Sequence, residues 1–295
     1  MLRPDLPGWR SLLFVPVIVE RFVAAAHKRG ADGIVLDLED SVPEAEKARA
    51  RGLIHSAAER VGRWGADVLV RINRPWRHAW RDIEVAVEPG VAALMCPKTE
   101  SAEQLQIIAE ILDDLEAEKK LPRGHTRLVA MIETAGALFR AQEIAAATPR
   151  LVGMTLGAED FASSVGMEPL PEALQAPNQL VIIAARTAGI LPLGFMGTVA
   201  EYKDLDAFRA TIRRSRRFGF LGGACIHPGQ VPILNEEYGP QPDEVARAER
   251  LIAAYDTALA RGAGAVEFEG RMIDVPVVER ARRVLEQAAR FRDKR

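Results

Sequence analysis

The chain alternates short apolar runs with amphipathic stretches of helical length, and this alternation constrains its fold more than any other feature. Continuous apolar strands are typical of a parallel sheet covered on both faces, and strands that alternate with helices predict βαβ units. The runs rich in Val, Ile and Leu lie at residues 12–15, 33–38, 68–72, 91–95, 128–132, 151–156, 190–195 and 224–226.

This succession of strand and helix predicts an α/β fold, the parallel (β/α)₈ TIM barrel. An open doubly wound sheet is the structural alternative, because counting runs does not show closure. The long connection after the sixth run is predicted to carry an extra helix around residues 173–187. We assign residues 1–239 to the barrel domain. Residues 240–295 predict a helix, a small hairpin that turns near Glu269-Gly270, and a last helix, which together form a C-terminal extension.

Composition and charge exclude several function classes. Lys and Arg number 39 against 41 Asp and Glu, and a net charge of 39 − 41 = −2 argues against a nucleic-acid partner. No apolar run approaches the ~20 residues that span a bilayer, and the opening residues lack the apolar core of a signal peptide, so no membrane partner is expected. Two distant cysteines, Cys96 and Cys225, exclude a disulfide framework and favour a cytoplasmic location.

The motifs of several enzyme classes are missing from the sequence. It contains no HExxH, GxSxG, GxGxxG or Walker loop, and no CxxC pair. Their absence argues against a zinc peptidase, an α/β-hydrolase, a Rossmann dehydrogenase and a P-loop NTPase.

Charged residues follow the apolar runs at their C-terminal ends, one run after another. In a barrel of parallel strands these ends meet at one rim, where catalytic groups collect. Exposure to water also makes strand ends polar, but it gives no reason to exclude apolar residues from so many of them. The residues predicted to converge are Asp37, Glu39 and Asp40, Arg71 and Asn73, Lys98 and Glu100, Glu133, Glu159 and Asp160, and His227.

Glu133 and Asp160 are separated by 160 − 133 = 27 residues, about one strand–helix repeat. They are therefore expected on adjacent strand ends, where two carboxylates repel each other unless a cation or a shared proton intervenes. The oxygen-rich surroundings favour Mg²⁺ as that cation. The alternative is a pair of salt bridges from these carboxylates to Arg71 or Lys98.

Arg71 and His227 each allow two interpretations. A guanidinium in a barrel mouth needs an anion, and a substrate carboxylate would satisfy Arg71 through a bidentate contact. The alternative partner is Glu39 or Asp40. His227 stands before a proline, where it either transfers protons or positions a loop.

An ordered series of motifs resembles one family. The segments are 10–16 (RSLLFVP), 36–43 (LDLEDSVP) with Lys47 and Arg49, 70–73 (VRIN), 97–100 (PKTE), 132–135 (IETA), 157–161 (GAEDF), 225–228 (CIHP) and 270–274 (GRMID). Together they resemble citrate lyase β-subunit-like proteins of the HpcH/HpaI aldolase superfamily. Each motif alone is weak, but their order from residue 10 to residue 274 is specific.

The resemblance implies a (β/α)₈ barrel enzyme, a Mg²⁺-dependent carbon–carbon lyase. Its substrate would be a 3-hydroxyacyl thioester such as malyl-CoA, citramalyl-CoA or a citryl thioester, cleaved to acetyl-CoA or a related thioester and a 2-keto acid. Glu133 and Asp160 would hold the Mg²⁺, and Arg71 would bind the keto-acid carboxylate. Asp274, in the extension, would transfer a proton in the site of a neighbouring protomer of a homotrimer or a hexamer built from trimers.

The same motifs suggest the remaining site residues. We assign Arg71, Glu133 and Asp274 as catalytic. Substrate binding is assigned to Arg71 and Glu133 with Phe14, Arg21, Ile226 and His227, and cofactor binding to Arg10 and Lys47.

Two departures from the family pattern concern the thioester carrier more than the metal. Val17 stands where members usually have glycine, and Gly223 where they often have lysine. Arg21 would supply the positive charge in place of that lysine. These changes keep three alternatives open. The first is a thioesterase on malyl-CoA-like substrates, and the second is a non-catalytic carrier-binding subunit of a lyase complex. The third is an aldolase on free hydroxy-keto acids, in which Asp274 would have no role.

Overall fold

The computed structural model describes residues 2–199 and 202–292, and the chain divides into two compact units, 1–235 and 236–295. The boundary falls four residues before the one predicted from the sequence (239 − 235 = 4). No helix among the described residues has the length and apolar character that crossing a bilayer requires.

In the first unit, the described residues form one sheet of eight parallel strands in the order β7-β6-β5-β4-β3-β2-β1-β8. The predicted apolar runs supply all of them. The strands are β1 (Ser11–Pro16), β2 (Gly33–Asp37), β3 (Asp67–Arg71), β4 (Ala93–Cys96), β5 (Arg127–Ile132), β6 (Leu151–Leu156), β7 (Leu191–Leu193) and β8 (Gly223–Cys225).

The two ends of this sheet meet, so the open doubly wound alternative is excluded. Leu193 forms a parallel bridge with Gly222, immediately before β8. The Gly194 N–H donates to the Gly222 carbonyl at 2.8 Å, and the Leu221 N–H donates to the Pro192 carbonyl at 3.1 Å. The predicted TIM-like barrel is confirmed as a nearly closed one.

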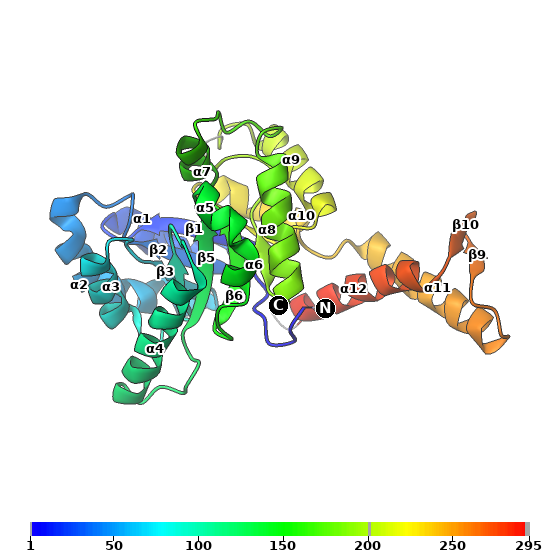
Figure 1. Cartoon of the computed structure of the whole chain (residues 1–295), viewed down its shortest axis with the longest axis horizontal. Coiled ribbons are helices and arrows are strands. Elements are labelled where there is room, and N and C mark those ends of the chain that lie inside the picture. Colours follow the sequence, from blue (N-terminus) through cyan, green and yellow to red (C-terminus); the bar gives the residue numbers. More distant parts are fainter. Residues whose placement is uncertain (1, 200–201, 293–295) are drawn as a thin grey trace. The chain divides into compact units, whose positions relative to one another are not determined.

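Helices connect the strands and surround the barrel (Figure 1). The predicted extra helix is α8, which begins at Gln175 and ends at Ala188. The helices of the first unit are α1 (Glu20–Ala26), α2 (Lys47–Val61), α3 (Trp76–Ala86), α4 (Ala102–Glu118), α5 (Ala135–Phe139), α6 (Ala141–Ala145), α7 (Ala158–Val165), α8, α9 (Leu205–Phe218) and α10 (Val231–Glu237), the last of which runs across the boundary.

The barrel interior is packed with apolar side chains from alternate positions of the strands. Met95 of β4 and Met131 of β5 belong to this core, and Trp9 and Leu6 join it from the segment before β1. The Trp9 indole N–H donates to Asp67 Oδ2 at 2.7 Å, which satisfies the polar edge of that buried ring.

The second unit contains α11 (Pro242–Ala260), the hairpin β9 (Val266–Phe268) and β10 (Arg271–Ile273), and α12 (Val275–Arg292). Glu269 and Gly270 make its turn with φ of +50° and +74°, a conformation that suits glycine at the second position. Leu251, Tyr255, Ile273, Val278 and Ala281 are among the side chains of its small core. The helix–hairpin–helix order matches the predicted extension.

The close approach of the residue before β8 to the segment before β1 predicts that Gly222 tolerates no side chain. A Cβ at this position would lie 1.9 Å from the Trp9 carbonyl oxygen, so Gly222→Ala forces the backbone of β1 and the β8 approach apart. We expect a loss of about 3 kcal/mol or more in the free energy of unfolding, measured by urea denaturation.

Gly52 is the matched control, because it lies inside α2 and a Cβ at this position would meet nothing within 4 Å. Gly52→Ala should leave stability unchanged or raise it by about 0.5–1 kcal/mol. Equal effects of the two substitutions would contradict this close approach at Gly222.

Candidate active site at the mouth of the barrel

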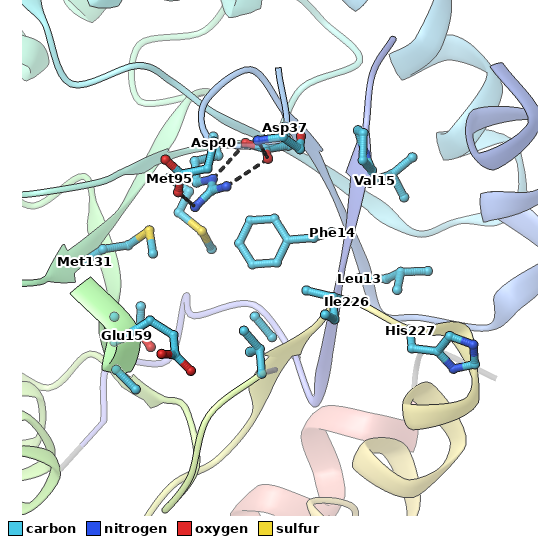
Figure 2. Close-up of a pocket in the computed structure, with 18 of the residues that line it drawn as sticks. Leu13, Phe14, Val15, Asp37, Asp40, Met95, Met131, Glu159, Ile226 and His227 are labelled. Atoms are coloured by element: carbon cyan, nitrogen blue, oxygen red, sulfur yellow. Dashed lines mark hydrogen bonds and ion pairs between the residues drawn. The ribbon is translucent and has the colours of Figure 1, made fainter. Parts of the chain in front are cut away.

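A cavity of about 880 Å³ opens at the carboxyl ends of the strands (Figure 2). Apolar residues form most of its wall, with Phe14, Met95, Met131, Phe195 and Ile226 among them. The charged side chains of strand ends and following loops form the other part; those lining the cavity include Asp37, Asp40, Arg71, Glu133, Glu159 and Asp160. These six charged residues therefore converge at one rim of the barrel, as the sequence predicted.

Arg71 ends β3 and is held by carboxylates from the strand beside it. Its Nε and Nη2 donate to the two oxygens of Asp37 at 2.7 and 2.8 Å. Its Nη1 lies 3.1 Å from Glu39 Oε2 and 3.2 Å from Asp40 Oδ2. The guanidinium also lies 4.8 Å from the centre of the Phe14 ring. The sequence predicted Glu39 or Asp40 as the structural partner and missed the bidentate partner, Asp37.

Burial would raise the pKa of Asp37, but hydrogen bonds and charge attraction from Arg71 outweigh it and keep that pKa below its ordinary value. Glu39 shows the opposite balance. Burial, with the nearby charge of Asp40, raises the pKa of Glu39 to about 7 despite Arg71 and Lys98. The end of β2 therefore presents a carboxylate with a lowered pKa, and the loop after it presents Glu39, whose pKa is raised to about 7.

Glu133 follows β5 and is almost completely buried. One of its oxygens accepts the backbone N–H of Lys98 at 2.5 Å. Gly157 leaves the room that the carboxylate occupies, because a Cβ there would lie 2.4 Å from Glu133 Oε1. Burial and the charges of Glu39 and Asp160 raise the pKa of Glu133 to about 7.

Lys98 connects three of the carboxylates. Its backbone binds Glu133, while its ammonium lies 3.2 Å from Glu39 Oε1 and 3.3 Å from Asp160 Oδ1. The backbone of Lys98 has a φ of +45°, which residues other than glycine rarely adopt outside functional sites and tight turns. Although burial lowers the pKa of Lys98, the charges of Glu39, Glu133 and Asp160 raise it above its ordinary value.

We call Asp37, Glu39, Asp40, Glu133 and Asp160 the mouth carboxylates. Among the described residues, the cations that contact them are Arg71 and Lys98. A third cation, the Lys47 ammonium, binds the carbonyls of Leu38 and Glu39 beneath the loop after β2, at 2.7 Å each. Glu159 and Arg29 also line the cavity. With every group ionised, the four cations Arg29, Lys47, Arg71 and Lys98 and the six carboxylates leave 4 − 6 = −2. A divalent cation would neutralise this charge.

The donor set suits Mg²⁺, which takes one or two carboxylates and completes its shell with water or substrate oxygens. Glu133 and Asp160 both line the cavity, and both contact Lys98. No group of three or more His, Cys, Asp or Glu side chains in the described residues has the geometry of a complete protein-made metal site. A Mg²⁺ ion held by Glu133 and Asp160 would need water or substrate oxygens to complete its coordination shell. The salt bridge from Asp160 to Lys98 is the alternative partner named in the sequence analysis.

The structure places four further predicted residues on the wall of the cavity or beside it. Phe14 and Ile226 line it, and Arg21 stacks on Phe22, another lining residue, at 4.8 Å. His227 also lines it, but its Nδ1 accepts the Gly229 N–H at 3.1 Å and its ring stacks on Tyr202. These contacts fit the loop-positioning interpretation of His227.

Two residues predicted to bind a cofactor have other contacts. Arg10 precedes β1, at the amino end of the barrel, and forms a bidentate salt bridge with Asp32, which precedes β2. The structure does not bring it to the mouth, because parallel strands put their first residues at the opposite end from their last. Lys47 is buried beneath the mouth with its ammonium bound to two carbonyls, so it supports the loop after β2.

The structure shows the surroundings of Val17 and Gly223, the two residues that depart from the family pattern. Val17 is buried. A Cβ at Gly223 would lie 3.1 Å from the Gly194 carbonyl oxygen, so a lysine there would require a small shift where β7 ends.

Asp274 lies in the second unit. Its side chain is exposed and its Oδ1 accepts the Val277 N–H at the start of α12. Met272 and Val275, on either side, are exposed apolar residues, while Ile273 is buried in the core of that unit.

Comparisons with known proteins show similarity to one family. The HpcH/HpaI aldolase/citrate lyase family matches residues 10–228. The citrate lyase subunit beta of Leuconostoc mesenteroides subsp. cremoris is 35% identical over 283 residues, with 95% of this chain and 93% of that protein covered. Two proteins of Cereibacter sphaeroides are also similar. An L-malyl-CoA/beta-methylmalyl-CoA lyase is 36% identical (96% and 92% covered), and a (3S)-malyl-CoA thioesterase is 34% identical (95% and 94% covered).

The chain is also similar to a solved structure, the protein CitE of Mycobacterium tuberculosis in complex with magnesium, acetoacetate and coenzyme A. The TM-score is 0.76 at 30% identity, with 97% of this chain and 100% of that chain covered.

The raised pKa of Glu133 predicts a pH dependence of stability. Without metal, the folded chain binds a proton at Glu133 up to about pH 7, whereas the unfolded chain releases it near the ordinary pKa of 4.5. The folded state binds more protons in this window, so the free energy of unfolding should fall as pH rises from 4.5 to 7, by up to about 3 kcal/mol.

Glu133→Gln removes this titration and keeps an acceptor for the Lys98 N–H, so its stability should decline less over the same window. Thermal melts of both proteins in a chelator at several pH values measure the difference. Parallel pH profiles would contradict the assignment.

Proposed function

Because this chain belongs to the HpcH/HpaI aldolase/citrate lyase family, we propose that it is a Mg²⁺-dependent lyase. It would cleave the carbon–carbon bond of a 3-hydroxyacyl thioester and release acetyl-CoA or a related thioester with a 2-keto acid. The observation that carries this proposal is the shared position of Glu133, Asp160 and Arg71 in one cavity with an excess of two negative charges. The magnesium and coenzyme A in the similar structure add support.

Glu133 and Asp160 would hold the metal. When bound, Mg²⁺ supplies the positive charge that stabilises negative charge developing on substrate oxygens. Arg71 would bind the keto-acid carboxylate. Its Nε and one Nη2 hydrogen are fixed by Asp37, which orients the guanidinium and leaves its second Nη2 hydrogen for a substrate.

Asp274 of a neighbouring protomer, in a homotrimer or a hexamer built from trimers, would transfer a proton in this site. Cleavage removes the substrate hydroxyl proton and later delivers a proton to the enolate carbon, so a carboxylate within reach of either atom is needed. The exposure of Asp274 between two exposed apolar side chains supports a role at a surface of the second unit that another protomer covers.

Hydrolysis of the thioester is the second candidate function, favoured by the 34% identity to a malyl-CoA thioesterase. The same metal and carboxylate groups would then activate a water molecule. Product analysis separates the two reactions, since hydrolysis of malyl-CoA yields free CoA and malate, whereas cleavage yields acetyl-CoA and glyoxylate. Binding of acetyl-CoA and a keto acid without any turnover would instead favour a carrier-binding subunit.

Substitution of either metal-holding carboxylate should abolish activity and metal binding together. Glu133→Gln and Asp160→Asn are each expected to lower kcat/KM for malyl-CoA or citramalyl-CoA cleavage by about 10³-fold or more, because stabilisation of the transition-state charge is lost. Calorimetry with MgCl₂ should show weakened binding in the same variants.

The matched control is Glu118→Gln, an exposed carboxylate at the end of α4. It should retain both activity and Mg²⁺ affinity. Lyase activity retained by Glu133→Gln or Asp160→Asn would count against the proposed function.

The origin of Asp274 can be tested by mixing two inactive variants. Glu133→Gln and Asp274→Asn should each be inactive alone. Co-expressed in one oligomer, they place an intact Glu133 opposite an intact Asp274 in some sites, so about a quarter of the wild-type activity should return in a cyclic trimer.

If Asp274 instead serves the site of its own chain, no mixed oligomer contains an intact site. Co-expression would then restore nothing, and the assignment to a neighbouring protomer would be wrong.

A further inference from the structure

The left-handed backbone of Lys98 is contacted by a side chain from the neighbouring strand end. Arg74 lies in the loop after β3, and its Nε donates to the Lys98 carbonyl at 3.1 Å. Within residues 2–199 and 202–292, no other group donates a hydrogen bond to this carbonyl. The Arg74 guanidinium also lies 6.0 Å from the centre of the Trp76 ring, at the start of α3. Arg74 therefore joins the loop after β3 to the loop after β4.

The backbone that carries Arg74 is fixed by a buried carboxylate. The backbone N–H and the side-chain Nδ2 of Asn73 both donate to Asp82 Oδ2, at 2.8 and 2.6 Å. Asp82 is completely buried in α3, and its other oxygen accepts Arg51 Nη1 at 3.1 Å. Asn73, which was predicted at the rim, is therefore buried against α3. These bonds fix the position from which the Arg74 side chain reaches Lys98.

Both peptide groups that flank the Cα of Lys98 are hydrogen-bonded. The first donates its N–H to Glu133 at 2.5 Å. The second is bound at both ends, because its carbonyl accepts Arg74 Nε and its N–H, that of Thr99, donates to the Met131 carbonyl at 3.0 Å. The φ of +45° between these groups is unfavourable for lysine and persists only where neighbours fix it. Arg74 contributes a charged donor, which forms a stronger hydrogen bond than a neutral one.

The conformation of Lys98 determines how two carboxylates are presented to the cavity. Its N–H holds one oxygen of Glu133, while its ammonium lies 3.2 Å from Glu39 and 3.3 Å from Asp160. A change of φ to the right-handed range would rotate the side chain relative to the N–H by about 100°. The N–H and the ammonium could not then both keep their contacts, so the left-handed conformation is what joins them.

We propose that Arg74 is a positioning residue of the metal site, because its bond to the Lys98 carbonyl holds Lys98 in the conformation that presents Glu133 and Asp160 to a shared cation. The inference rests on the proposed function and adds to it a residue that acts through Lys98 rather than on the substrate. Arg74 binds the backbone of Lys98 alone. The ammonium therefore stays able to move from Asp160 to Glu39 when a metal ion binds Asp160.

Two substitutions separate the hydrogen bond from the bulk of the side chain. Arg74→Met keeps an apolar stem and removes the donor, so calorimetry on the full chain should show Mg²⁺ binding weakened by at least about fivefold. At saturating Mg²⁺, kcat for malyl-CoA cleavage should fall by about tenfold while KM stays within about twofold, because the contacts to the substrate are unchanged. Arg74→Lys supplies another charged donor and should bring both Mg²⁺ affinity and kcat to within about threefold of the wild type.

Arg77→Met is the matched control, because Arg77 is exposed in the same segment and pairs with Glu44 at the surface. It should leave Mg²⁺ affinity and kcat unchanged. A folded Arg74→Met protein with wild-type Mg²⁺ affinity and kcat would overturn the proposal, even if its melting temperature were lower, since Arg74 would then serve stability alone. A folded Arg74→Lys protein no better than Arg74→Met would also overturn it.

Failure of the proposed function gives a different result. If the wild-type chain neither binds Mg²⁺ nor cleaves thioesters, the proposed function is wrong, and a metal-free crystal structure of Arg74→Met decides the role of Arg74. Loss of the hydrogen bond from the Lys98 N–H to Glu133 would show that Arg74 positions Lys98 whatever the site binds. The same bond intact, with φ of Lys98 still positive, would overturn that role. If Arg74→Met does not fold, Arg74→Gln, whose shorter side chain does not reach the carbonyl, replaces it in each measurement.

Discussion

An excess of carboxylate charge at one end of the barrel is the constraint on which the account depends. Six acidic side chains, the mouth carboxylates and Glu159, arrive there because eight parallel strands end at one rim, and closure between Leu193 and Gly222 joins β7 to β8, the two ends of the sheet. Arg71 and Lys98 lie among them without balancing their charge. The composition of the site, and not any single residue, favours the binding of a divalent cation.

This arrangement costs the folded chain stability. Glu39 and Glu133 are buried, and each has a pKa raised to about 7, which means that their charged forms are held at an energetic disadvantage. Lys98 keeps a left-handed backbone conformation to place both its N–H and its ammonium toward carboxylates. Unfavourable groups of this kind persist in proteins where function requires them and the surrounding structure fixes them. Away from the mouth, by contrast, Arg10 and Asp32 pair one cation with one carboxylate through two hydrogen bonds.

The sequence predicted the framework and much of the rim, because both follow from periodicity and strand direction. Apolar runs located the strands, and charged residues after them located Arg71, Glu133 and Asp160. Which apolar side chains line the cavity could not be predicted in the same way. Strands of a parallel barrel are apolar on both faces, so nothing in the run at residues 91–95 distinguishes inward-facing Met95 from its outward-facing neighbours. The register of the sheet supplies that information.

Other residues required knowledge of backbone conformation or of long-range pairing. The triple contact of Lys98 depends on a positive φ that no local sequence signal marked. Gly157 matters because of Glu133, 24 residues earlier (157 − 133 = 24), whose carboxylate fills the space of its missing side chain. Arg10 was assigned to cofactor binding from a motif that continues into β1, although a residue before a parallel strand lies at the opposite end from the mouth. Strand direction alone places Arg10 away from the mouth.

A crystal structure of the chain with Mn²⁺ in place of Mg²⁺ and with pyruvate tests the central claim most directly, because the anomalous signal identifies the metal. The account predicts one metal ion at about 2.0–2.2 Å from an oxygen of Glu133 and an oxygen of Asp160, with pyruvate completing its shell and the Lys98 ammonium withdrawn from Asp160. A metal ion bound elsewhere, or Lys98 still joined to Asp160 beside bound pyruvate, would contradict it.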